Sequence, residues 1–344
     1  MTINPVSEFN PDRLLNVKAL KQLSVLFNKG AVPHALLFSG YEGLGKRDTA
    51  VLFAMACNCN KSQGSGNIAD IIDCTCRSCN KIRSGNHPDI HWVEPSGTFI
   101  KIDQIRELCE AVAMKPYEAG MRVVIISSAQ NMNIEASNSL LKLLEEPPQK
   151  TILILTAIQA SDLLPTIFSR CQTVHFTPVS QDIIKSAALE KFNISPDEAE
   201  IIAVLSQGSL SKINACKNIK GIKELICLRN WLLQMCCELT GNGARVSMET
   251  ALAFAEKLSK DKKKLPDSLD IITSWLRDIM VVKYQPDRII NKDLFQNIRL
   301  ISQNLSTNSL LSKLDVLQAA QQGLRTNANI RLVMEIMVLG LIKE

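Results

Sequence analysis

The sequence predicts a parallel α/β domain followed by an all-helical region, and three observations support this prediction. Short apolar runs alternate with helical patterns over residues 122–176, which is the order of strands and crossovers in a parallel sheet. A glycine-rich loop at residues 40–46 stands between an apolar run and a helical pattern. From about residue 221 to residue 342, apolar residues recur at helical spacing in one segment after another.

Length and composition limit the classes of protein that the chain can belong to. The chain has 344 residues, which exceeds one ordinary hydrophobic core and predicts two or three domains. Its apolar content is 46% and its formal net charge is +5, so it lacks the dense basic character typical of strong nucleic-acid binders. Residues 1–10 are polar and no apolar run reaches the about 18 residues of a spanning helix, so we expect a cytoplasmic protein without membrane contact.

The first elements are a helix, a strand and a phosphate-loop pattern. Residues 10–28 carry apolar side chains at helical spacing, and residues 34–39 form the apolar run of a short strand. In the loop that follows, glycine backbone N–H groups and a lysine can surround phosphate oxygens. The candidate binding residues are Gly40, Gly43, Gly45 and Lys46.

The match to the phosphate-loop motif ends after Lys46. The next position of the motif is Ser or Thr, whose hydroxyl binds Mg²⁺, and here it is Arg47. An arginine side chain has no oxygen to offer a metal ion. Two interpretations therefore stay open, a loop that binds nucleotide weakly and a turn that has lost its ligand.

A cluster of cysteines follows the helix that begins at the loop. The chain has 11 cysteines, and in a reducing compartment they are expected to be metal ligands or free thiols rather than disulfides. Cys74, Cys76 and Cys79 lie within six residues, and Cys57 and Cys59 end the preceding helical pattern. This density predicts a closed tetrahedral site of four thiolates that holds a structural Zn²⁺ ion.

Residues 122–176 predict three strands and two crossovers. The expected strands are residues 123–126, 151–156 and 172–176. A helix capped by Asn133 or Ser137 and stopped by Pro147 connects the first two strands. A helical turn at residues 163–168 connects the second strand to the third.

Two strings within this stretch also carry a family resemblance. They consist of Ala136, Asn138, Leu140, Leu141, Lys142, Leu144, Glu145, Glu146, Pro147 and Pro148, and of Thr166, Ile167, Ser169, Arg170 and Cys171. Together they resemble the signature of bacterial AAA+ clamp-loader subunits, and the similarity extends over nearly the whole chain. The resemblance implies three domains. These are an AAA+ α/β domain at residues 1–178 with a zinc-binding insertion at 57–79, a helical lid domain at 179–220, and a helical collar or oligomerisation domain at 221–344.

The resemblance also shows which groups of an ATPase the chain lacks. ATPases of this family carry an acidic pair directly after the strand that ends at Ile126, and here the two positions are Ser127 and Ser128. Hydroxyl groups cannot carry the charge that metal-assisted phosphoryl transfer requires. Ser211 stands where active relatives have an arginine that senses the nucleotide. With Arg47, these departures predict a subunit that does not hydrolyse ATP by itself.

Arg170 is the candidate catalytic residue, and the resemblance supplies its role. In the family the Ser-Arg-Cys triplet lies at a subunit boundary, where its arginine reaches the neighbour's ATP in trans as an arginine finger. Such a residue raises the rate of nucleotide hydrolysis by about 10³ to 10⁵. A subunit without activity of its own can therefore be needed for catalysis in the next one.

The zinc ligands follow from the same resemblance. The family's spacing from the loop lysine selects Cys59 as the first ligand rather than Cys57. The other three are usually spaced C-x-x-C-x-x-C, whereas this chain has C-x-C-x-x-C, with Asp73 in the place of the second ligand. The expected set is therefore Cys59, Cys74, Cys76 and Cys79, with Cys57 or Asp73 as alternates.

The implied function is that of a subunit of the DNA polymerase III holoenzyme that helps load a sliding clamp onto primed DNA. The implied partners are the clamp-loader ATPase subunits and a clamp-opening delta subunit, and, through the assembly, the sliding clamp and primer–template DNA. One alternative is an active ATPase motor subunit of the same family. Another is a zinc-containing DNA-binding module that acts alone, which the modest net charge disfavours.

Overall fold

The computed structural model describes residues 16–60, 67–209, 212–213, 216, 219–241, 247–262, 264–325 and 328–342. It divides the chain into two compact units, Met1–Ile184 with Ser206–Ala215, and Lys185–Leu205 with Cys216–Glu344. Residues 179–220, predicted as a lid domain, contribute to both units, so the division into three domains stays a prediction.

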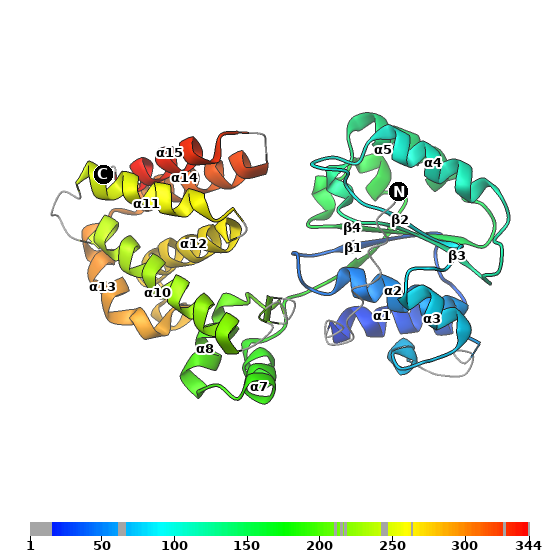
Figure 1. The fold of residues 1–344 in the computed structure, drawn as a ribbon, viewed down its shortest axis with the longest axis horizontal. Helices are drawn as coiled ribbons and strands as arrows, with labels where there is room; N and C mark the ends of the chain where they lie inside the picture. Colours follow the sequence, from blue (N-terminus) through cyan, green and yellow to red (C-terminus); the bar gives the residue numbers. More distant parts are fainter. Residues whose placement is uncertain are drawn as a thin grey trace. The chain divides into compact units, whose positions relative to one another are not determined.

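A five-stranded sheet forms the centre of the first unit (Figure 1). The order of the strands is β2-β3-β4-β1-β5, and all neighbouring strands are parallel. The strands are β1 (Ala35–Ser39), β2 (Ile90–Val93), β3 (Arg122–Ile126), β4 (Thr151–Ala157) and β5 (Gln172–His175). The predicted parallel α/β fold is confirmed, and the edge strand β2 is an addition that the sequence analysis did not predict.

Helices cover both faces of this sheet (Figure 1). On one face lie α1 (Val17–Asn28), α2 (Lys46–Asn58) and α3 (Arg77–Arg83), and on the other lie α4 (Ile102–Ala113), α5 (Ile134–Glu145) and α6 (Pro165–Phe168). Because side chains alternate along a strand, Val123 and Ile125 pack in the first core while Val124 and Ile126 pack in the second. This is why β3 is apolar at every position from 123 to 126.

Local signals fix the two ends of α5. The side chain of Asn133 accepts a hydrogen bond from the backbone N–H of Ala136 at 2.8 Å, so the helix begins after the first of the two predicted caps. The helix ends at Glu145, two residues before Pro147, which cannot continue it. The last residue of the helix, Glu145, lies at the surface and is paired with Arg170, which follows α6.

The second unit is helical, as the apolar spacing predicted. Its helices are α8 (Pro196–Leu205), α10 (Ile219–Gly241), α11 (Met248–Lys260), α12 (Leu265–Val281), α13 (Phe295–Asn304), α14 (Thr307–Arg325) and α15 (Ile330–Ile342), and α7 (Gln181–Phe192) runs across the boundary between the units. Trp275 is fully buried in its core. Within the described ranges, no helix is long and apolar enough to cross a membrane.

Candidate functional site

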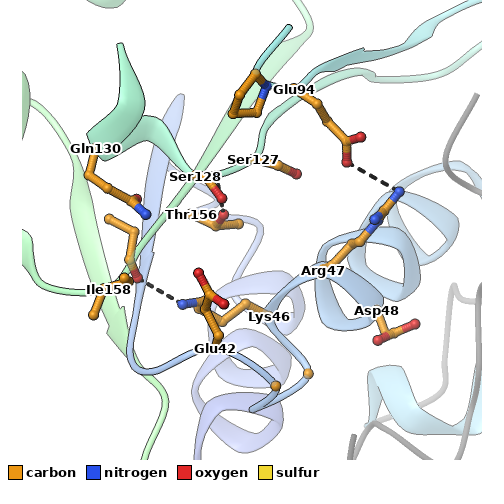
Figure 2. Close-up of a pocket in the computed structure, with 14 residues that line it drawn as sticks. Glu42, Lys46, Arg47, Asp48, Glu94, Ser127, Ser128, Gln130, Thr156 and Ile158 are labelled. Atoms are coloured by element: carbon orange, nitrogen blue, oxygen red, sulfur yellow. Dashed lines mark hydrogen bonds and ion pairs between the residues drawn. The ribbon is translucent and has the colours of Figure 1, made fainter. Parts of the chain in front are cut away.

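The glycine-rich loop forms one side of a pocket of about 540 Å³ (Figure 2). The loop follows β1 and Ser127 follows β3, so the pocket lies at the carboxyl ends of the strands. Ligands of open parallel sheets bind at this edge. Its lining residues are Glu42, Gly43, Gly45, Lys46, Arg47, Asp48, Glu94, Pro95, Ser127, Ser128, Gln130, Thr156, Ala157 and Ile158.

The glycines of the loop are required by its backbone path. Gly40 has φ 152°, and a Cβ at this position would lie 2.5 Å from the carbonyl oxygen of Phe176. Gly43 and Gly45 have φ 78° and 79°, in the left-handed region that favours glycine. The loop thus contains the positive-φ glycines that such a turn needs, although Gly40 is not among the residues that line the pocket, and phosphate binding by these residues stays a prediction.

The ammonium group of Lys46 is bound to the protein's own backbone. It donates hydrogen bonds to the carbonyl oxygens of Gly40 and, at 3.3 Å, of Tyr41. A third hydrogen bond, to the carbonyl oxygen of Ala157, measures 2.9 Å (Figure 2). Burial lowers the pKa of Lys46 to about 8, and the negative charge of Glu42 partly opposes that decrease. In this arrangement the three ammonium donors meet carbonyl oxygens rather than the space inside the pocket.

Arg47, at the position of the metal ligand, is turned toward the edge strand. Its guanidinium group forms a 3.2 Å ion pair with Glu94 (Figure 2). Its Cζ lies 5.0 Å from the centre of the Trp92 ring. Glu94 directly follows β2 and was not identified from the sequence, because the strand before it was not predicted. The residue at the Ser/Thr position of the phosphate-loop motif is thus held in an ion pair at the wall of the pocket.

The two serines after β3 line the same pocket. Ser127 has a buried hydroxyl oxygen with no hydrogen-bond partner among the described residues. Ser128 has φ 53° and ψ 51°, and its backbone N–H donates to the hydroxyl of Thr156 at 3.0 Å. Both side chains therefore lie at the carboxyl end of β3, and neither supplies a charge there. The third predicted departure, Ser211, lies outside the described residues.

Four cysteines meet beside the far end of α2. The sulfur atoms of Cys59, Cys74, Cys76 and Cys79 all lie within 4.8 Å of one another. The Sγ of Cys59 is 3.5 Å from that of Cys74 and 3.9 Å from that of Cys76. Four thiolates at about 2.3 Å from a tetrahedral Zn²⁺ are about 3.8 Å apart. This donor set can therefore bind zinc without a large rearrangement.

The structure brings together the four cysteines that the sequence analysis preferred. The alternates Cys57 and Asp73 do not belong to the cluster, and burial raises the pKa of the Cys57 thiol to about 12. Arg83 donates to the carbonyl oxygens of Ile72 at 2.5 Å and Cys74 at 3.2 Å, so it supports the loop that carries two of the thiols.

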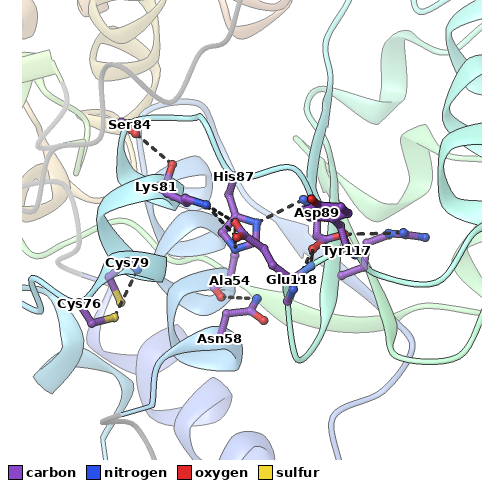
Figure 3. Close-up of polar contacts among 12 residues, drawn as sticks. Ala54, Asn58, Cys76, Cys79, Lys81, Ser84, His87, Asp89, Tyr117 and Glu118 are labelled. Carbon is purple, nitrogen blue, oxygen red and sulfur yellow. Dashed lines mark hydrogen bonds and ion pairs between the residues drawn. The ribbon is translucent and has the colours of Figure 1, made fainter.

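A buried polar network beside the cysteines has a structural role (Figure 3). Asp89 accepts hydrogen bonds from the backbone N–H groups of Tyr117, Glu118 and Ala119 at 2.7 to 2.8 Å. Burial alone would raise the pKa of Asp89, but these hydrogen bonds hold it below its ordinary value. His87 accepts from the backbone N–H of Asp89 at 3.2 Å, so it acts in a turn rather than as a ligand of the cysteine cluster.

Arg170 lies away from the chain's own pocket. It follows α6 and donates from Nη1 to the carbonyl oxygen of Thr166 at 3.0 Å. Its Nη2 donates to Oε1 of Glu145 at 2.8 Å, and 37% of the arginine side chain is exposed. Arg170 is not among the residues that line the pocket, so within this chain it does not face the phosphate loop.

Comparisons with known proteins decide the family. Residues 15–180 match the family described as "DNA polymerase III, delta subunit", and residues 233–343 match "DNA polymerase III, delta subunit, C terminal". The chain is 31% identical to DNA polymerase III subunit delta' of Bacillus subtilis, over 95% of this chain and 96% of the relative. The chain belongs to the delta' family of DNA polymerase III subunits.

A second delta' protein is also similar to this chain over most of its length. The delta' subunit of Haemophilus influenzae is 27% identical over 89% of this chain and 88% of the relative. A DNA polymerase III gamma subunit-related protein from Thermotoga maritima matches 94% of this chain and 98% of its own chain, at 20% identity and a TM-score of 0.48. The family resemblance read from the sequence is thereby confirmed at the level of the delta' family.

Proposed function

We propose that this delta' family member is a clamp-loader subunit that does not hydrolyse ATP and that helps load a sliding clamp onto primed DNA in replication. The observation that carries the proposal is the composition of the pocket at the phosphate loop. Arg47 is paired with Glu94 where a metal ion would be bound, and Ser127 and Ser128 stand where carboxylates would be needed. The pocket is lined by the glycine-rich loop and Lys46, and serines stand at the positions of the groups that would activate water.

The second part of the proposal concerns Arg170. Its exposed guanidinium group lies outside the chain's own pocket, and Arg170 precedes the last strand by two residues. Its role is to reach the ATP of a neighbouring subunit and to stabilise the charge that develops on the γ-phosphate. The proposed partners are therefore clamp-loader ATPase subunits and the clamp-opening delta subunit, with the clamp and primed DNA reached through the assembly.

The cysteine cluster is proposed to hold a structural Zn²⁺ ion with Cys59, Cys74, Cys76 and Cys79 as its ligands. The distances between the thiols and the four-sulfur donor set support this role. Four protein ligands leave no open position for a water molecule. The ion would therefore stabilise the fold around α3 and take no part in a reaction.

The decisive experiment compares ATP hydrolysis by the chain alone with hydrolysis by the reconstituted clamp-loader complex. Wild type, Arg170→Ala and Arg106→Ala are compared, because Arg106 is also an exposed arginine paired with a carboxylate, at 3.9 Å from Asp103. We expect no turnover by the chain alone. In the complex, Arg170→Ala should remove the part of the total ATP hydrolysis rate that comes from the neighbouring subunit's site. Arg106→Ala should leave the rate unchanged.

The same experiment tests the alternative of an active motor subunit. The retained Lys46 and the size of the pocket favour that alternative. Magnesium-dependent turnover by the chain alone, lost on Lys46→Ala, would establish it. An unchanged rate for the Arg170→Ala complex at normal assembly would instead remove the trans role of Arg170.

A further inference from the structure

We infer that Glu145 is a positioning residue for Arg170: it holds the guanidinium group in an intramolecular ion pair that a nucleoside triphosphate on a neighbouring subunit must displace. This inference rests on the proposed trans role of Arg170 and adds its regulation. Glu145 would set how much nucleotide the neighbouring site needs before the arginine engages.

The geometry joins two separate elements. Glu145 is the last residue of α5, and Arg170 lies between α6 and β5. Nη1 of Arg170 is bound to the carbonyl oxygen of Thr166 and, at 3.4 Å, to the hydroxyl of Ser169. The backbone of α6 therefore orients one arm of the guanidinium group, and the carboxylate of Glu145 holds the other arm at 2.8 Å.

The ion pair between Arg170 and Glu145 lies where another anion can replace the carboxylate. The side chain of Glu145 is 51% exposed and that of Arg170 is 37% exposed, so water screens their attraction. Exposed ion pairs contribute little to stability, and a phosphate accepts two parallel hydrogen bonds from a guanidinium group. The ion pair is therefore strong enough to orient the arginine in the free chain and weak enough to be replaced by a phosphate.

Carboxylate and phosphate compete for the arm that Nη2 provides. Both are anions that accept from the same donors, and two negative charges a few ångströms apart repel each other. Engagement of Arg170 with a triphosphate therefore favours release of Glu145. Removing the charge of Glu145 while keeping an oxygen acceptor should favour the engaged state.

The chain offers a matched control in the next residue. Glu146 is also exposed and stands outside α5, and it forms no ion pair among the described residues. Glu145→Gln and Glu146→Gln each remove one negative charge from the same surface. Only the first removes it from the contact with Arg170.

The test measures ATP hydrolysis by the reconstituted clamp-loader complex as a function of ATP concentration. The complexes contain wild type, Glu145→Gln, Glu146→Gln, Arg170→Ala or the double variant Glu145→Gln/Arg170→Ala. We expect Glu145→Gln to lower the ATP concentration at half-maximal rate by about two- to five-fold, the range of an exposed ion pair. Glu146→Gln should match wild type, and Glu145→Gln should have no effect when Arg170 is absent. The shift should also diminish at high salt, because the contact is screened.

Three other results would contradict the inference, each at a different step. If Glu145→Gln matches Glu146→Gln while Arg170→Ala slows hydrolysis, the competition is excluded and the trans role stands. If Glu145→Gln raises the half-maximal concentration or lowers the maximal rate, Glu145 holds Arg170 in its active position, and the displacement is excluded. If Arg170→Ala has no effect on an assembled complex, the proposed function fails, and with it the basis for this inference.

Discussion

Arg47 and Glu94 form a 3.2 Å ion pair that spans the pocket wall between the phosphate-loop helix and the edge strand of the sheet. The pair places a fixed positive charge where related loops hold Mg²⁺ through a hydroxyl group. The replacement of the hydroxyl by Arg47 removes a metal ligand, but it does not change the backbone of the loop, whose glycines keep their positive φ angles.

Restoring the hydroxyl at position 47 should not restore hydrolysis. Arg47→Thr supplies the missing metal ligand but leaves Ser127 and Ser128, which cannot activate the attacking water. We expect phosphate release by the isolated variant to remain at the background of the wild-type chain. Measurable magnesium-dependent release by Arg47→Thr would mean that another carboxylate, such as Glu94, already serves the reaction.

Loss of one zinc ligand should destabilise the first unit. Cys59→Ser removes one thiolate, and we expect less than one equivalent of zinc by metal analysis and a Tm lower by about 10 °C, from a loss of about 3–5 kcal/mol. Cys57→Ser is the control, because Cys57 lies outside the cluster although it stands two residues away. Equal metal loss in both variants would show that the ligand set is wrong.

Gly40 should be far less tolerant of alanine than Gly30. Both have positive φ, but a Cβ at Gly40 would meet the Phe176 carbonyl oxygen at 2.5 Å, whereas a Cβ at Gly30 meets nothing within 4 Å. We expect Gly30→Ala to cost about 1 kcal/mol from the left-handed backbone and Gly40→Ala about 3 kcal/mol. Urea unfolding of the two variants measures the difference, and equal midpoints would contradict the close approach at Gly40.

Lys46 should make stability depend on pH in the alkaline range. Because its folded pKa is about 8 and its unfolded value is 10.5, the unfolded chain binds more protons between these values, so this lysine's contribution to stability rises as the pH increases. Below pH 8 both states are protonated and the burial penalty is constant. We expect the free energy of unfolding of wild type, relative to Lys46→Met, to increase from pH 8 to pH 10.5 in urea titrations. A difference that does not change with pH would mean that Lys46 keeps its ordinary pKa.

The sequence predicted the central strands well because their signal is local. Val123, Val124, Ile125 and Ile126 are apolar at every position, and only a strand covered on both faces requires that pattern. β2 is short, lies at an edge and is only partly buried, so Ile90–Val93 has no such pattern. Because this strand was not predicted, Glu94 was not identified either. Glu94 reaches Arg47 only because β2 pairs with β3.

The site could be predicted only where residue type and spacing were sufficient. The thiol cluster follows from the density of cysteines, but the choice between Cys59 and Cys57 depends on the backbone at the end of α2. Cys59 caps the helix with an extended backbone, φ −92° and ψ 123°, while Cys57 remains inside the last turn. The contact of Arg170 with Glu145 joins residues 25 apart in the chain, so it depends on how α5 packs against α6.

Helix α2 begins at Lys46 beside the pocket and is capped by Cys59 in the thiol cluster. Its 13 residues make a rod of about 20 Å with the phosphate loop at one end and the metal ligands at the other. A metal bound by Cys59 would clamp the far end of this rod to α3. The zinc module would then restrain the orientation of α2. It would stabilise the shape of the pocket from a distance, without contributing an atom to it.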